Sequence, residues 1–370
     1  MESTERTYSG ESLKWLSDPD SPNLESATIT VPLSHFTTTS QTLTIPLLRL
    51  RGTSASRNLL LNPGGPGTSG LSLLHRRGAQ LRAIVGPSFH LVSFDPRGVN
   101  QNLPICAPQL SSNPTPEEVS SWAEEIATSA ASQRYINTPE TAADMNTILD
   151  ALGQSDMYYW GFSYGSLLGQ TYAMMFPERS ARVIIDGVVN VFEWYTELLR
   201  PSQFESRAAV IEGFFDECFT NKNALSNLAP DAKQLQHKVM HFLDTPITVD
   251  NDGILDKYSL YDGLLHDLFF HERWESLASR LAALLQGDPV PAFEAYGQKK
   301  PPSIEGIIIR CNDMVSGKDK WPQGQDLLKL ISPQLEKYPD DASDIMQEYF
   351  TFPSLTILNH QQSQRRNIRF

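Results

Sequence analysis

The feature that most constrains this chain is a serine between two glycines, Gly161-Phe-Ser-Tyr-Gly165, where a strand pattern changes to a helix pattern. Residues 156–160 are typical of a strand, and residues 166–176, which end before Pro177, are typical of a helix. In this setting G-x-S-x-G is a nucleophile elbow, because glycine tolerates a tight strand-to-helix turn that a Cβ would obstruct. An ordinary glycine-rich turn is the alternative. The flanking strand and helix favour Ser163 as a catalytic nucleophile.

Such a nucleophile also requires an oxyanion hole, formed by the backbone N–H after the serine and a second N–H from an earlier strand–helix loop. Tyr164 follows Ser163 and supplies the first group. The loop Asn62-Pro-Gly-Gly-Pro-Gly67 follows a short apolar strand pattern, and its glycines would let a backbone amide approach the oxyanion. We therefore predict Gly65 and Tyr164 as the donors. The simpler interpretation is that the loop is rich in glycine only to turn sharply.

Strand and helix patterns alternate around these motifs, which predicts an α/β fold with a mostly parallel sheet. An N-terminal hairpin is expected to add two antiparallel strands, at 27–33 and 43–50. A helix at 138–152 is expected to begin with Thr138 as the capping residue and Pro139 in the first helical position. The other expected elements are a helix at 71–84, strands near 58–62, 89–94 and 182–189, and a surface excursion at 107–136 with an acidic helix at 117–127.

The pattern changes after residue 189. Residues 190–302 consist of amphipathic helical segments with no clear strand, notably 207–219, 232–243 and 274–285. A helical insertion at this point is expected to form a lid over the carboxyl edge of the sheet. The chain is thus predicted to have a core at 1–189, a helical lid at 190–302, and a short remainder at 303–370 that ends in a polar, basic tail.

Five blocks extend these motifs: Asn62-Pro-Gly-Gly-Pro-Gly-Thr-Ser-Gly70, Phe94-Asp-Pro-Arg-Gly-Val99, Gly161-Phe-Ser-Tyr-Gly-Ser-Leu-Leu-Gly-Gln-Thr-Tyr-Ala173, Phe176-Pro177 and Arg182-Val-Ile-Ile-Asp-Gly-Val-Val189. Together they resemble the tripeptidyl and prolyl aminopeptidase-like branch of the α/β-hydrolases, over most of residues 10–315. The resemblance implies a serine hydrolase with a helical lid and no cofactor. Its better-known members release residues from peptide N-termini, and related members act on esters, lactones or amides.

The chain departs from this family after the lid. Family members continue into a final β-α-β region that carries the triad acid, in a Gly-x-x-Asp-x-x-Thr-Pro-like context, and the base histidine. Residues 303–370 contain no Asp-x-x-Thr-Pro, so this region and its core strands are expected to be missing or replaced. A serine without an aligned base loses most of the triad's rate. The runner-up hypothesis is therefore an impaired or inactive hydrolase-fold binding protein, or a truncated product, and an acyltransferase is a third.

Residue order alone offers one complete triad, because serine, acid and histidine follow one another in this fold. Asp313 follows a strand-like segment at 307–311, and His360 follows another at 355–358. The resemblance instead matches Asp313 to a position within the lid segment, so both interpretations stay open. His237 and His241 have the i, i+4 spacing of two metal ligands on one helix, but no carboxylate or cysteine completes a recognisable set. We therefore expect no metal.

The charge balance argues against one class of partner. Thirty Lys and Arg against 43 Asp and Glu give a net charge of −13, which would repel a nucleic-acid backbone. The excess acid would attract a cationic substrate such as a free peptide N-terminus, although solvated acidic faces also explain it. Three cysteines, no long apolar run and no secretory pattern at the N-terminus lead us to expect a cytoplasmic protein without a disulfide framework, acting on a peptide or a small molecule.

Overall fold

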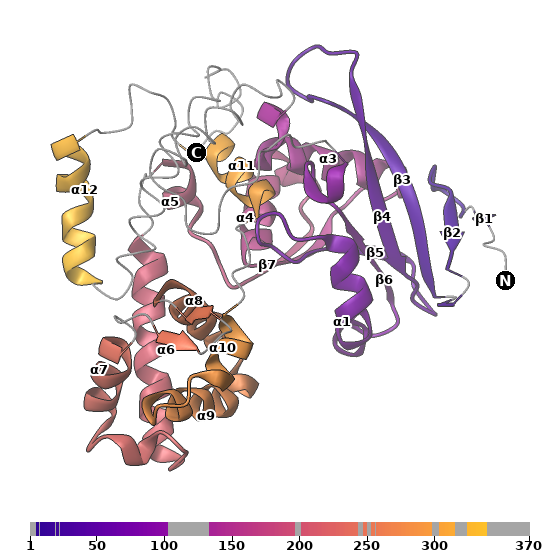
Figure 1. The fold of residues 1–370 in the computed structure, drawn as a ribbon. Helices are drawn as coiled ribbons and strands as arrows, with labels where there is room; N and C mark the ends of the chain where they lie inside the picture. The colour runs from indigo at the N-terminus through magenta and orange to yellow at the C-terminus, as the bar shows by residue number, and fades with distance from the viewer. Residues whose placement is uncertain are drawn as a thin grey trace. The chain divides into compact units, whose positions relative to one another are not determined.

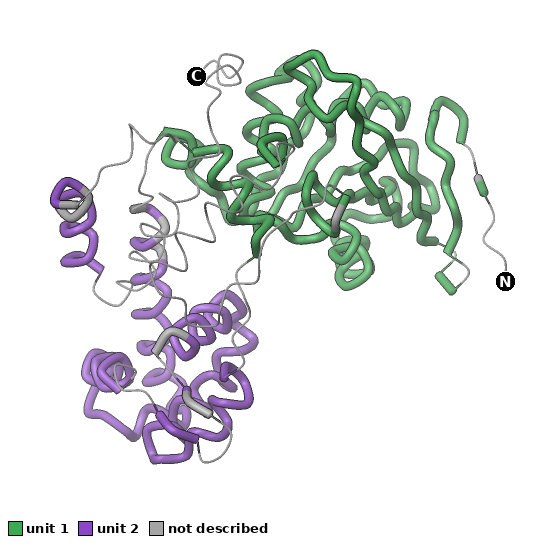
Figure 2. The backbone as a smooth tube through the Cα atoms, turned by 45° about the horizontal axis from the view of Figure 1, so that its top comes forward, with its two compact units in different colours: residues 1–199, 302–322, 350–370 green, residues 200–301, 323–349 purple. Residues whose placement is uncertain are grey.

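The computed structural model describes residues 5–338 apart from 7, 19, 22, 103–132, 197–200, 243–246, 250–252, 256, 298–302 and 315–323. The chain divides into two compact units, which Figure 2 colours separately. Unit 1 comprises residues 1–199, 302–322 and 350–370, and unit 2 comprises residues 200–301 and 323–349. The acidic helix expected at 117–127, the segment 355–358, His360 and the basic tail lie outside the described residues.

Unit 1 is built on an eight-stranded mixed sheet with the order β1-β2-β3-β4-β6-β5-β7-β8 (Figure 1). The pairs from β1 to β4, and the pair of β4 with β6, are antiparallel. The pairs among β6, β5, β7 and β8 are parallel, so the carboxyl ends of these four strands share one edge of the sheet. The strands are β1 (Glu5–Arg6), β2 (Trp15–Ser17), β3 (Leu24–Pro32), β4 (Thr42–Leu50), β5 (Arg57–Asn62), β6 (Phe89–Phe94), β7 (Tyr158–Phe162) and β8 (Arg182–Asp186).

Three helices of unit 1 pack on this sheet or on one another. Helix α1 (Gly70–Val85) contacts β4, β5 and β6, and α4 (Tyr164–Met175) contacts β7 and β8. Helix α3 (Thr138–Ala151) contacts α4 and β3. One apolar cluster between α1 and the strands contains Leu48, Leu59, Leu61, Leu73, Leu74, Leu81 and Leu91. The α/β fold and its antiparallel N-terminal hairpin are therefore confirmed.

Two element boundaries differ from the sequence prediction. Helix α3 is capped by Asn137, whose side chain accepts a hydrogen bond from the Glu140 N–H, so Thr138 is the first helical residue and not the cap. Asparagine is at least as good a capping residue as threonine, and the sequence pattern does not separate the two positions. Strand β7 lies two residues later than the predicted 156–160 and includes Gly161. The Gly-x-Ser-x-Gly motif therefore begins inside the strand.

A larger difference concerns the segment 307–311, which was expected to be strand-like and belongs to helix α11 (Ile304–Asp313). The Ser303 side chain caps this helix by accepting a hydrogen bond from the Gly306 N–H at 3.1 Å. A run of isoleucines fits a buried strand or a buried helix face equally well, so the cap and the tertiary contacts decide. Asp313 consequently ends a helix and does not follow a strand.

Strand β8 forms one end of the sheet. Within the described residues no strand pairs with its outer edge, and the Ile184 side chain on it is 55% exposed. The expectation that the final core strands are missing or replaced stays a prediction, because residues 339–370 lie outside the described residues. The predicted strand 182–189 is also shorter in the structure, because β8 ends at Asp186 and helix α5 (Val191–Thr196) follows shortly after.

Unit 2 is mainly helical and has its own hydrophobic core. Its buried side chains come from all of the helices between residues 201 and 296, and include Phe214, Leu235, Leu264, Leu281 and Ala292. A short antiparallel hairpin, β9 (Ile247–Val249) with β10 (Gly253–Leu255), corrects the expectation that this region has no strand. The helices are α6 (Pro201–Thr220), α7 (Ala232–Phe242), α8 (Lys257–Leu268), α9 (Trp274–Leu285), α10 (Val290–Tyr296) and α12 (Gly324–Lys337).

Candidate active site

Ser163 lies between β7 and α4 with a left-handed backbone, at φ 54° and ψ −120°. Such a conformation costs a non-glycine residue about 1–3 kcal/mol and persists only where the surroundings hold it. Here the Ser163 N–H donates to the Asp186 carbonyl at 2.8 Å, and the Ser163 carbonyl accepts from the Ser166 N–H at 2.8 Å. The Ser163 side chain makes no hydrogen bond within the described residues, and the residue is exposed on unit 1. The turn therefore presents a free hydroxyl.

The glycines of the elbow are required by close approach of backbone to backbone. A Cβ on Gly161 would lie 2.2 Å from the Gly165 carbonyl oxygen, and a Cβ on Gly165 would lie 2.6 Å from the Asn62 carbonyl oxygen. A Cβ on Gly169, one turn later, would lie 2.7 Å from the Tyr159 ring. These contacts give α4 a flat face, which lets the helix pack directly on the sheet.

The glycine-rich loop after β5 lies directly against this elbow. Gly64 has φ 93°, and a Cβ on it would be 2.3 Å from the Phe162 carbonyl oxygen and 3.0 Å from the Ser163 Cβ. The Asn62 side chain fixes the loop, because its Oδ1 accepts a hydrogen bond from the Gly64 N–H at 2.9 Å. The structure thus brings the loop and the predicted nucleophile together.

The two predicted donors of the oxyanion hole, Gly65 and Tyr164, flank this contact. Neither backbone N–H donates a hydrogen bond to any residue in the described part of the chain. For Tyr164 this follows from its place as the first residue of α4, where helical N–H groups have no acceptor within the helix. Both groups are therefore available to an acceptor supplied by a ligand.

Helix α11 begins against the same loop. A Cβ on Gly67 would lie 2.4 Å from the Ser303 hydroxyl and 2.9 Å from the Gly306 nitrogen, and a Cβ on Gly306 would lie 2.6 Å from the Pro66 carbonyl oxygen. The start of α11 and the loop are thus in backbone contact. The sequence prediction did not include this contact. Its only sign in the sequence is Gly306, a glycine in the first turn of α11.

The other end of α11 places the Asp313 carboxylate in a buried network. The Thr138 N–H donates to Oδ1 at 2.8 Å, and the Thr138 hydroxyl donates to Oδ2 at 2.5 Å. The Trp194 indole N–H also donates to Oδ2, at 3.0 Å. Thr138 Oγ1 lies 2.6 Å from the Tyr164 hydroxyl as well. Asp313 is therefore engaged at the start of α3, while its suggested partner His360 lies outside the described residues.

The surroundings of Tyr164 keep its hydroxyl protonated. Burial raises the pKa of Tyr164 well above its ordinary value, and the Asp313 carboxylate raises this pKa further, against a smaller opposing effect of the Thr138 hydrogen bond. A neutral phenol can donate its hydrogen to Thr138. Sequence reasoning missed Thr138 and Trp194 as parts of the site, because nothing in their local pattern connects them to Asp313.

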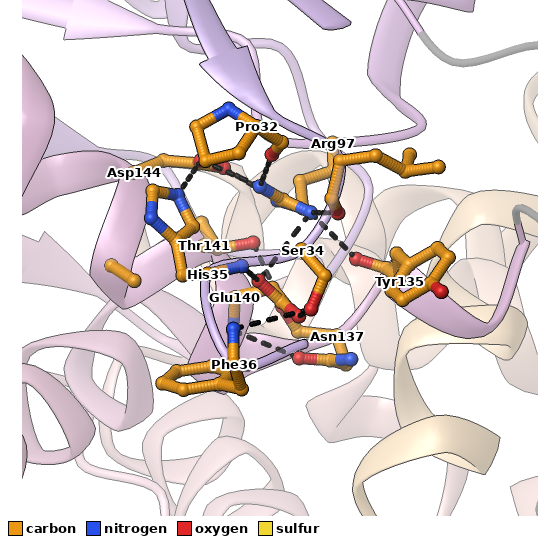
Figure 3. A network of polar contacts seen from close by, with 12 residues as sticks. Pro32, Ser34, His35, Phe36, Arg97, Tyr135, Asn137, Glu140, Thr141 and Asp144 are labelled. Carbon is orange, nitrogen blue, oxygen red and sulfur yellow. Dashed lines mark hydrogen bonds and ion pairs between the residues drawn. The ribbon is translucent and has the colours of Figure 1, made fainter. Parts of the chain in front are cut away.

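A separate buried network, drawn in Figure 3, fixes the turn after β6 against α3. The Arg97 guanidinium donates to both oxygens of the Asp144 carboxylate, at 2.6 and 2.7 Å. His35 Nε2 lies 2.8 Å from the same carboxylate, and Glu140 accepts from the Ser34 hydroxyl at 2.7 Å and from the His35 N–H at 2.8 Å. Because Arg97 holds Asp144, we interpret this histidine–acid pair as structural.

The histidine pair predicted to resemble a metal motif lies on α7. The His237 and His241 rings are stacked with centroids 6.2 Å apart. Among the described residues no group of three or more His, Cys, Asp or Glu side chains is placed to hold a metal ion. In the same part of the chain, no helix combines the length and the apolar character needed to cross a bilayer.

The chain belongs to the α/β-hydrolase fold family, whose model matches residues 57–259 and therefore includes the glycine-rich loop and the elbow. It is similar to the tripeptidyl aminopeptidase of Streptomyces lividans, with 31% identity over 207 residues that cover 48% of this chain and 38% of that protein. It is also similar to the serine protease Hip1 of Mycobacterium tuberculosis, with 26% identity over 367 residues that cover 85% of this chain and 68% of that protein. The chain thus spans well under half the length of the Streptomyces relative.

Solved structures resemble this chain only distantly. One is a probable hydrolytic enzyme from Pseudomonas aeruginosa PAO1. The aligned residues cover 92% of this chain and 91% of that chain, with 14% identity and a TM-score of 0.31. The family assignment rests on the family model and not on this likeness.

Proposed function

We propose that this protein is a serine hydrolase that acts through an acyl-enzyme at Ser163. The observation that carries the proposal is an exposed, unbonded serine hydroxyl on a strained turn, packed against the loop of Gly64. The residues next to this contact, Gly65 and Tyr164, each have a backbone N–H that donates to no described residue. Strain held at one residue, with unused donors beside it, is typical of a catalytic elbow. A turn with only a structural role needs neither.

The proposed reaction begins with the substrate carbonyl oxygen accepting hydrogen bonds from the Gly65 and Tyr164 N–H groups. Ser163 Oγ then attacks the carbonyl carbon while the base takes its hydrogen, and the negative charge that forms on the carbonyl oxygen is stabilised by these two donors. When the intermediate collapses, the bond to the amine or alcohol breaks, the base returns the hydrogen to this leaving group, and an ester stays on Ser163. In the second step the base takes a hydrogen from water, whose oxygen attacks the ester, and the hydrogen returns to Ser163 Oγ as the acid leaves.

Activation of Ser163 requires a base, because an isolated serine is a weak nucleophile near neutral pH. The described contacts give Ser163 Oγ no histidine partner, and Asp313 is engaged by Thr138 and Trp194. His360 stays the candidate base, because it follows Ser163 and Asp313 in the order that serine, acid and histidine take in this fold. The same observation favours the second candidate function, a hydrolase-fold protein that binds an acyl compound without turning it over.

A fluorophosphonate probe separates these two functions. A hydrolase is expected to form a covalent adduct in wild type and none in Ser163→Ala, since the probe requires an activated serine. Equal signals from the two proteins would leave only the binding function. Ser163→Ala keeps the fold as a control, because the exposed hydroxyl makes no hydrogen bond within the described residues.

For the substrate we propose a peptide with a free N-terminus, or a small ester, lactone or amide. The names of the two relatives support a peptide, and the net charge of −13 favours a cationic amine over an anion or a nucleic acid. Peptide p-nitroanilides with free and with acetylated N-termini, beside p-nitrophenyl esters, test this choice. Preference for the free amine supports an aminopeptidase, and turnover of the esters alone supports an esterase.

We further propose that the helical unit 2 serves as the lid of this site, and that the protein is cytoplasmic. The proposal of a lid rests on the position of residues 200–301 in the chain, directly after β8 and α5. The location is supported by Cys218 and Cys311, which are buried thiols not joined in a disulfide, as expected in a reducing compartment. Fractionation of cells with an antibody to the protein tests the location.

A further inference from the structure

Tyr164 takes part in two arrangements at once. Its backbone N–H is one of the two proposed oxyanion donors, and its side chain belongs to the buried network of Asp313. We propose that Asp313 is a positioning residue of the oxyanion hole, which acts through Thr138 on Tyr164. The inference rests on the proposed function, since it concerns the same site. It gives Asp313 a role other than that of the triad acid.

The direction of each hydrogen bond in this network follows from chemistry. A carboxylate only accepts, so the Thr138 hydroxyl uses its single hydrogen on Asp313 Oδ2. The Thr138 oxygen must then accept from the Tyr164 hydroxyl, 2.6 Å away. The three side chains therefore form one directed chain, from Tyr164 through Thr138 to Asp313. Removal of either hydroxyl breaks it.

This chain is shielded from water. Thr138 is 0% exposed, Tyr164 2% and Asp313 4%. A partner lost from such a site is not replaced by solvent, and the group left behind is a buried polar atom without its hydrogen bond. The Tyr164 ring is also packed against Trp194, with ring centroids 5.8 Å apart. The side chain is thus held in one place at its tip and along its face.

Fixing the Tyr164 side chain also fixes its backbone. Tyr164 is the first residue of α4, so its N–H has no helical hydrogen bond of its own to orient it. An oxyanion donor acts only if its position matches the developing charge, and a displacement of ~1 Å at a reacting centre can cost ~10²-fold in rate. Anchoring the Tyr164 side chain at its hydroxyl therefore constrains the position of the Tyr164 backbone N–H, the proposed oxyanion donor.

Helix α11 connects this anchor to the second donor. Its last residue is Asp313, and its first turn contacts the loop of Gly65 through Gly67 and Pro66. Figure 1 shows α11 beside α3 and α4, as these contacts require. One helix thus contacts the loop that carries Gly65 and reaches Tyr164 through Thr138, which is the arrangement expected of a support for the hole.

The same helix α4 offers a matched control. Thr171 Oγ1 lies 2.9 Å from the Tyr195 hydroxyl, and both residues are buried. This pair has the same chemistry as Thr138 and Tyr164, but Thr171 lies seven residues further along α4 than Tyr164, and Tyr195 lies on α5. Thr171→Val and Thr138→Val therefore remove the same kind of bond at similar burial. The Tyr195 hydroxyl also approaches Thr138, but Thr171→Val leaves all three members of the chain from Tyr164 to Asp313 in place.

The test measures how fast a fluorophosphonate labels Ser163 as the probe concentration is varied, which separates probe affinity from the maximal labelling rate. We expect Thr138→Val to lower the maximal rate at least about tenfold with affinity nearly unchanged, since the defect lies in transition-state stabilisation. Thr171→Val is expected to keep both values within about twofold of wild type while losing comparable stability to urea. Asp313→Asn should resemble Thr138→Val.

Tyr164→Phe provides an independent variant if Thr138→Val does not fold, because it keeps the ring and the backbone N–H and removes only the hydroxyl. In a protein that carries both Thr138→Val and Tyr164→Phe, the losses in labelling rate should not add, because each substitution breaks the same chain of hydrogen bonds. Equal rates for Thr138→Val and Thr171→Val, or additive losses in the double variant, would overturn the role of Asp313 while leaving the hydrolase intact. A wild type no more reactive than Ser163→Ala would overturn the proposed function and this role together.

Discussion

Ser163 combines a left-handed backbone with close backbone neighbours, and both properties depend on glycines that the sequence displays. The motif, with the strand pattern before it and the helix pattern after it, was sufficient to predict the turn. Only glycine fits where a Cβ would meet a carbonyl oxygen at 2.2 Å, as at Gly161. The role of Asp313 could not be predicted in the same way. Its partners Thr138 and Trp194 are far away in the sequence, and only the folded chain brings them to one carboxylate.

Gly161→Ala is expected to destabilise the protein by about 1–3 kcal/mol, because the new methyl group must displace the backbone of Gly165. Gly213→Ala is the control, since a Cβ there meets nothing within 4 Å inside helix α6, and alanine should stabilise by about 0.5–1 kcal/mol. Urea denaturation followed by circular dichroism measures both changes. A Gly161→Ala protein as stable as wild type would contradict the close packing described at the elbow.

Helix α11 shows why the strands of the sheet were easier to predict than the elements that follow β8 in the chain. Strands β3 to β6 could be predicted because apolar stretches are bounded by turn residues, whereas Ile304-Glu-Gly-Ile-Ile-Ile-Arg-Cys carries a strand-like run within a capped helix. Burial of Ile308 and Ile309 outweighs the preference of isoleucine for strands. The error moved Asp313 from the end of a strand to the end of a helix, and so changed its predicted role.

Strand β6 carries a histidine that should make stability depend on pH. Burial, and secondarily the charge of Arg49, lower the pKa of His90 from 6.5 to about 4, and its neutral Nδ1 accepts a hydrogen bond from the Gly52 N–H at 3.3 Å. Between these pH values the unfolded chain binds more protons than the native chain, so His90 makes stability fall as pH decreases from 6.5 to 4.

His90→Asn is expected to weaken this decline, because an amide oxygen can replace Nδ1 as the acceptor without taking up a proton. The measurement is the urea midpoint at several pH values between 4 and 7, for wild type and variant. Since carboxylates also titrate in this range, the difference between the two proteins is the relevant quantity. Parallel pH profiles would show that His90 is not buried as described.

At the scale of the whole molecule, the chain divides into two compact units, and the described residues of unit 2 include a hydrophobic core of its own. The described members of the core of unit 2 all lie between residues 211 and 296, within the continuous segment 200–301. Composition and helical periodicity were sufficient to predict a helical region there. They did not reveal that the chain returns to unit 1 for α11 and then contributes α12 to unit 2, because both helices have similar patterns.

A fragment of residues 200–301 is therefore expected to fold by itself. The described members of its buried cluster all belong to this segment, so apolar burial should offset the entropy of ordering the chain. Circular dichroism should show a helical spectrum and a cooperative thermal transition. A spectrum without helix, or a melt without a transition, would show that unit 2 depends on the remainder of the chain.

The central claim is that Ser163 is an activated nucleophile, and the most direct measurement is mass spectrometry of the intact protein and its tryptic peptides after treatment with a fluorophosphonate. We predict a single adduct per chain, located on Ser163, at a rate far above that of free serine. Thr138→Val should slow this adduct and Thr171→Val should not. An adduct on another residue, or none in wild type, would contradict the account.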